Sequence, residues 1–89
     1  MTKLIQDIVA KISTFNHIKN VHHVHVWQLN EDEIHLEAHI DFNKDIALSQ
    51  FDKILHEIED FVLLEYDINH VNIQPEFGKD DVKDVIVQD

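Results

Sequence analysis

The hydrophobic and polar positions of the chain follow two different periods, and the changes of period predict five elements. Apolar residues recur every three to four positions over residues 3–14 and 45–63, as they do in amphipathic helices. Residues 20–29, 33–42 and 67–76 favour strands instead, because they are rich in β-branched and aromatic residues or alternate between apolar and polar positions. The predicted order is helix, strand, strand, helix, strand.

Each predicted helix presents one apolar stripe. The first stripe consists of Leu4, Ile5, Ile8, Val9 and Ile12. The second consists of Ala47, Phe51, Ile54, Leu55, Ile58 and Val62. Asp45 is the expected N-cap of the second helix, because a carboxylate can accept hydrogen bonds from the first free backbone N–H groups.

The segment 33–42 is the clearest strand, because its alternation is unbroken. Its apolar set is Ile34, Leu36, Ala38, Ile40 and Phe42, and its polar set is His35, Glu37, His39 and Asp41. The polar residues 30–32 before it are typical of a turn, so we expect a hairpin with the strand at 20–29.

This order of elements predicts an α+β fold, a ferredoxin-like two-layer sandwich with two helices on one face of a three-stranded sheet. The other face of the sheet is expected to be open and polar. Pro75 and Gly78, the single proline and the single glycine, mark the end of the compact part. We therefore expect one domain over residues 1–78 and an acidic tail over residues 79–89, since 89 residues leave no room for a second domain.

The composition excludes several classes of partner. Seven lysines, no arginine and eighteen acidic residues give a formal net charge of −11, which repels nucleic-acid phosphates and anionic membrane surfaces. No apolar run approaches the roughly 20 residues that a membrane-spanning helix needs, so direct membrane insertion is not expected. Divalent cations or basic partners complement such a charge, although acidity can also serve only to keep a domain soluble.

The chain lacks the residues that most enzyme sites use. Cysteine is absent, which removes disulfides, thiolate metal sites and cysteine nucleophiles. The two serines, Ser13 and Ser49, lie in no nucleophile motif, and there is no glycine-rich phosphate loop. We therefore do not expect an enzyme.

Eight histidines are the unusual feature of so short a chain. Imidazole is the commonest protein ligand for zinc and related ions, and the ligands of one ion must converge on it. His35 and His39 share a face but lie about 13 Å apart along their strand, so they cannot share an ion. Pairing the first two strands places His23 opposite or close to His39, where a cross-strand metal pair is feasible. The third strand adds His70, Gln74 and Glu76 on the same open face.

The histidines gather in three short segments: VHHVHVW at 21–27, EAHI at 37–40 and HVNIQPE at 70–76. The first resembles the HDLHVW-type segment of the cytoplasmic C-terminal domain of cation diffusion facilitator transporters. The second resembles that domain's small residue followed by histidine, and the third its closing H-V-T-I-Q-x-E motif. The family's domain has the same order of helices and strands.

The resemblance implies a cytoplasmic domain that forms a homodimer and binds Zn²⁺ or a similar divalent transition metal. Closure of the dimer by metal would then regulate cation efflux by a transmembrane transporter domain. Matched residue by residue, the family's metal ligands fall on His22, His39 and Glu76, with His70 in the neighbouring ligand position of the third motif. His25 matches a histidine that more often supports the site than binds the metal.

The chain departs from the family pattern at three positions. His23 replaces the usual aspartate and so adds a ligand to the first segment, Asn72 replaces threonine, and Pro75 stands where a hydrophobic residue is usual.

His22 conflicts with the simple alternation of its strand. It has the parity of Val24 and Val26, whose side chains are expected in the core. It can reach the open face only if it lies at a strand end or next to a β-bulge.

Several functions remain open at the level of the sequence. The transporters of the family carry a transmembrane domain before this one, so the chain is expected to be either an excised regulatory domain or a stand-alone soluble relative that buffers or senses metal. A structural interaction domain with incidental histidines is a second class. A module of the same fold that binds small metabolites is a third.

Overall fold

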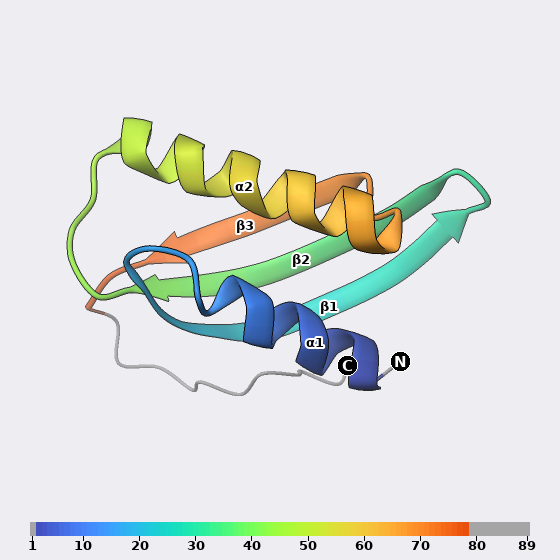
Figure 1. The fold of residues 1–89 in the computed structure, drawn as a ribbon, viewed down its shortest axis with the longest axis horizontal. Helices are drawn as coiled ribbons and strands as arrows, with labels where there is room; N and C mark the ends of the chain where they lie inside the picture. Colours follow the sequence, from blue (N-terminus) through green and yellow to red (C-terminus); the bar gives the residue numbers. More distant parts are fainter. Residues whose placement is uncertain (1, 79–89) are drawn as a thin grey trace.

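The computed structural model describes residues 2–78, and the predicted tail at 79–89 lies outside the described residues. All five predicted elements are present in the predicted order. They are α1 (Thr2–Ile12), β1 (Ile18–Asn30), β2 (Glu33–Phe42), α2 (Leu48–Tyr66) and β3 (His70–Glu76). Figure 1 shows them in two layers.

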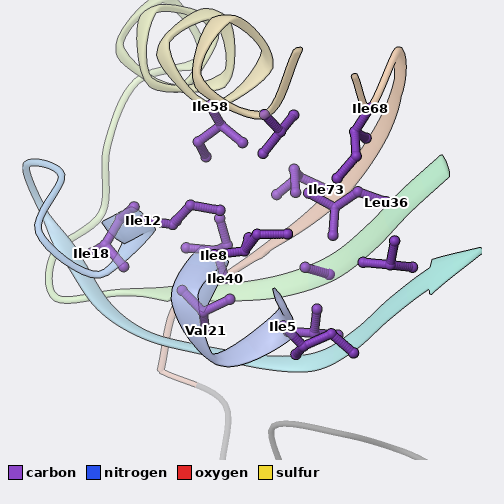
Figure 2. Close-up of a cluster of buried hydrophobic side chains, with 14 of the residues drawn as sticks. Ile5, Ile8, Ile12, Ile18, Val21, Leu36, Ile40, Ile58, Ile68 and Ile73 are labelled. Atoms are coloured by element: carbon purple, nitrogen blue, oxygen red, sulfur yellow. The ribbon is translucent and has the colours of Figure 1, made fainter. Parts of the chain in front are cut away.

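The three strands form one sheet in the order β1-β2-β3. β1 and β2 are an antiparallel hairpin, and β3 returns through α2 to pair with β2 in parallel. Figure 2 shows the buried side chains between the helices and one face of this sheet. The predicted ferredoxin-like sandwich, with both helices on one face, is therefore confirmed.

The core is built mainly from isoleucine and valine side chains of all five elements. Ile8 of α1, Ile40 of β2 and Ile58 of α2 are completely buried and belong to one cluster (Figure 2). The alternation of β2 is as predicted, because Leu36 and Ala38 face the same core while the polar residues between them do not.

Two boundaries differ from the sequence prediction. α2 begins and ends three residues later than expected, and its N-cap is Ala47 rather than Asp45. The N–H of Ala47 donates to Oε1 of Gln50 at 3.1 Å, so the side chain of a residue in the first turn pairs with the backbone at the start of the helix. The prediction of Asp45 as N-cap was therefore wrong. The helix ends at Tyr66, and the next residue, Asp67, caps it: its left-handed conformation (φ 58°) lets its N–H donate to the carbonyl of Leu63.

No helix among residues 2–78 has the combination of length and apolar character that crossing a lipid bilayer requires.

A β-bulge in β1 resolves the conflict over His22. The pairs His22–His39 and His25–Glu37 enclose three steps on β1 but only two on β2, so β1 carries one extra residue. His23 is that extra residue, and its backbone is in the left-handed conformation (φ 52°). Val21 and Val24 are therefore both buried, whereas His22 points to the face away from the helices. The condition that the sequence sets for His22 is met.

The complete burial of Ile58 predicts a large effect of its truncation. Ile58→Ala should lower the free energy of unfolding by about 2–5 kcal/mol, because it removes apolar contacts and leaves a cavity. Leu64→Ala, in the same helix but 82% exposed, should change it by less than about 0.5 kcal/mol. Urea unfolding followed by circular dichroism measures both, and equal losses would contradict this assignment of the core.

Candidate metal centre

The register of the sheet aligns polar side chains in rows across its open face, the face away from the helices. Partners on neighbouring strands continue from β1 through β2 to β3, so each row holds three residues. Along the open face, the first two rows are Asn20–Asp41–Glu76 and His22–His39–Gln74, a row of His25, Glu37 and Asn72 follows, and the last row is Trp27–His35–His70. The first two rows are adjacent, and the row of Trp27 lies at the other end of the sheet.

Glu76 joins the first two rows. Its Oε1 accepts a hydrogen bond from Nε2 of His22 at 2.9 Å, and its Oε2 accepts one from Nδ1 of His39 at 2.9 Å. Gln74 donates to the same Oε2 at 3.2 Å. The side chains of Glu76 and His22 are 1% and 0% exposed, so this carboxylate bridges two imidazoles inside the protein. Three of the four predicted ligands, His22, His39 and Glu76, thus lie together.

Asn20 orients the ring of His22. Nδ1 of His22 donates to Oδ1 of Asn20 at 2.7 Å, and Nδ2 of Asn20 donates to Oδ2 of Asp41 at 3.5 Å. Metal-binding histidines usually donate their other ring N–H to such an oxygen. An ion bound between His22 and Glu76 would take the place of the proton at Nε2, while the bond from Nδ1 to Asn20 stays in place. The sequence analysis did not identify Asn20. Its place two residues before a ligand, on the same side of the strand, is the feature that could have indicated it.

His23 completes the cluster. His22, His23 and His39 each offer a ring nitrogen within 4.8 Å of the others. The ring of His23 lies 4.8 Å from that of His39 and 5.1 Å from that of His22. The register partner of His39 is His22, so His23 reaches the cluster through the bulge and not through direct cross-strand pairing.

His70 lies outside this cluster. It pairs with His35 in the register of β2 and β3, and six residues of strand, roughly 20 Å, separate it from Glu76. Its Nε2 instead contacts Oε1 of Glu33 at 3.2 Å. His25 also points elsewhere, with its ring stacked on Trp27 at 4.6 Å. The predicted proximity of His70 to the other three residues is therefore wrong.

The donor set suits a divalent transition metal. Three imidazoles and one carboxylate match the nitrogen and oxygen ligands that zinc and similar ions take in proteins. The hydrogen bonds of Glu76 already hold two of the rings against the carboxylate. An ion would need neutral imidazoles, so metal and protons compete for the same nitrogens.

Comparison with known proteins identifies the family of the chain. A family model described as the cytoplasmic domain of cation efflux proteins matches residues 2–77. The zinc transporter ZitB of Yersinia pseudotuberculosis is 32% identical over 78 residues, which cover 86% of this chain and 22% of that transporter. The chain thus spans about a fifth of the length of the curated relatives that it matches.

Solved structures share the fold. The metal-bound C-terminal domain of the CzcD transporter from Thermotoga maritima superposes with a TM-score of 0.72 at 20% identity, covering 90% of this chain and 96% of that one. The C-terminal domain of the magnetosome protein MamB from Desulfamplus magnetovallimortis gives 0.75 at 15% identity, covering 90% and 99%. The predicted resemblance to this family is confirmed, and the chain belongs to the family of cytoplasmic domains of cation efflux proteins.

Proposed function

We propose that the chain is the metal-sensing module of a cation efflux system and binds Zn²⁺ or a similar divalent ion through His22, His39 and Glu76. The observation that carries this proposal is the buried carboxylate of Glu76 between two imidazoles. His23 is the added ligand that this chain brings to the site, since its ring lies within 5.1 Å of both other histidines.

The relatives support this choice of ligand. The ZitB proteins are named as zinc transporters, and the CzcD domain of the same fold is described as metal-bound. In a transporter, the module would lie at the cytoplasmic face of the membrane and act on a transmembrane domain. In a free-standing chain, the same site would act as a metal buffer or sensor. Neither role involves catalysis.

Homodimerisation is the second part of the proposal. Each chain carries a formal charge of −11, so two copies repel each other at close range. A divalent ion bound among acidic side chains neutralises part of this charge and favours a closer arrangement of the two copies. The metal would in this way set the closure of the dimer, and closure would regulate efflux.

Removal of two ligands tests the site. His22→Ala/His39→Ala should weaken Zn²⁺ binding at this site by more than about 100-fold, since even the loss of outer-shell partners weakens metal affinity 10–100-fold. Isothermal titration near neutral pH measures this binding. His56→Ala, an exposed histidine of α2, is the matched control and should bind as the wild type does. Absence of binding in the wild type, or equal binding in the double variant, would reject the site.

Glu76→Gln separates a metal ligand from a purely structural link. With Zn²⁺ at 100 times its Kd, the wild type should gain about 2.7 kcal/mol of stability. The variant should lose most of this gain, because the amide is a poor metal ligand, while its stability without metal falls by about 1–3 kcal/mol. Urea unfolding with and without Zn²⁺ measures both quantities. A variant that is destabilised but gains as much from Zn²⁺ as the wild type would show that Glu76 only links the strands.

Closure of the dimer has its own test. Small-angle X-ray scattering should give a smaller radius of gyration for the dimer when Zn²⁺ is added, and sedimentation should show that the number of chains is unchanged. The His22→Ala/His39→Ala variant should show no such contraction. A wild-type profile that does not respond to saturating Zn²⁺ would contradict closure while leaving metal binding intact.

A further inference from the structure

We propose that Glu33, His35 and His70 form a second, separate site for a divalent transition ion such as Zn²⁺. The three residues lie at the end of the open face opposite Glu76. His35 and His70 are register partners on β2 and β3, and Glu33 stands two residues before His35 on the same side of β2. Each residue offers one ligand atom, and the three atoms lie within 4.8 Å of one another.

The ring nitrogens of His35 and His70 are placed to bind an ion. Nε2 of His35 is buried and has no hydrogen-bond partner among the described residues, a situation that costs about 1–3 kcal/mol for a polar group. Nε2 of His70 faces Oε1 of Glu33 at 3.2 Å. An ion bound between these groups would satisfy the unpaired nitrogen and replace a half-exposed ion pair by coordination.

The geometry requires only a local adjustment. The rings of His35 and His70 are stacked in parallel with centroids 4.3 Å apart, and one ring nitrogen of each lies within 4.8 Å of the other. Ligands of a tetrahedral zinc ion lie about 3.4 Å apart. The contact of His70 with Glu33 at 3.2 Å already meets this separation, and the other pairs lie within 4.8 Å, so they need to approach by about 1.4 Å at most. The side chain of His70 is 48% exposed and can rotate, which uncovers Nε2 of His35 and turns both nitrogens toward one ion.

There is room for an ion and for the water that completes its shell. A shallow cavity of about 280 Å³ borders the cluster and is lined by Trp27, His35 and His70, among others. Two imidazoles and one carboxylate suit Zn²⁺, Co²⁺ or Ni²⁺, whereas the chain has no thiolate that would select softer ions. The exposure of His70 and Glu33 predicts weaker binding than at the buried Glu76.

The two sites are independent. His35 and His39 lie four residues apart on β2, about 13 Å, so no residue of one site can bind the ion of the other. The register of β3 places His70 away from Glu76, in the row that starts at Trp27.

Trp27, the single tryptophan, reports on this site selectively. Its ring stacks on that of His35 with centroids 5.0 Å apart, so rotation of the histidines alters the surroundings of the indole. Titration of the full chain with Zn²⁺ should therefore change the tryptophan emission until one ion is bound at this site. The change should persist in His22→Gln/His39→Gln and vanish in His35→Gln/His70→Gln.

Glu33→Gln provides the sharper variant, because it leaves the stacked rings of Trp27, His35 and His70 in place. Its emission without metal should equal that of the wild type, while half-saturation should require at least about tenfold more Zn²⁺, since a ligand matters no less than the outer-shell groups worth 10–100-fold. Glu31→Gln, in the adjacent turn, is the matched control and should titrate as the wild type does.

Three results would overturn the second site. They are a wild-type emission that does not respond to Zn²⁺, a response that survives in both Glu33→Gln and His35→Gln/His70→Gln, and a response that disappears in His22→Gln/His39→Gln. The last would mean that Trp27 reports only the site at Glu76, and loss of calorimetric binding in that same variant would still support the first site. Failure of one site is therefore distinguishable from failure of the other.

Discussion

The candidate metal centre depends on one extra residue in β1. Because side chains alternate along a strand, His22 and Val24 should share a face, yet one is needed on the open side and the other in the core. The bulge at His23 shifts the alternation by one step between them. Val21 and Val24 can then both be buried while His22 meets Glu76. Without the bulge, β1 could place Val24 in the core or His22 on the open face, but not both.

The buried carboxylate makes the site rigid. A charge inside a protein is tolerated only when hydrogen bonds or opposite charges compensate it, and Glu76 receives such bonds from His22, His39 and Gln74. Asn20 fixes the other side of His22. The same contacts that stabilise the carboxylate hold the rings close to the positions in which an ion would use them, so little ordering remains for binding. A pre-ordered site of this kind can link the occupancy of metal to the position of the strands.

The open face carries histidine and glutamate side chains at both of its ends, but the two groups differ in burial. At the end near Glu76, the carboxylate and His22 are buried and hydrogen-bonded to each other. At the other end, His70 and Glu33 are half-exposed, and His35 is stacked on Trp27. A buried site favours tight binding and slow exchange, whereas an exposed one favours rapid exchange at higher metal concentration. A strongly acidic chain with both would respond to metal over a wider range than one site allows.

The periodicity of the sequence determined the five elements, their order and the polar face of β2, because these depend on local side-chain patterns. It also placed His39 and Glu76 on one face. The rise per residue that separates His35 from His39 along β2 also separates His70 from Glu76 along β3, so the sequence alone could have kept His70 apart from Glu76. Tertiary structure decided how the strands align with each other, which local patterns cannot determine. The pairing of β1 with β2 set the bulge that turns His22 outward, and the parallel register of β3 aligned Glu76 with Asp41 and His70 with His35. Register is a property of two strands together, so no single segment contains it.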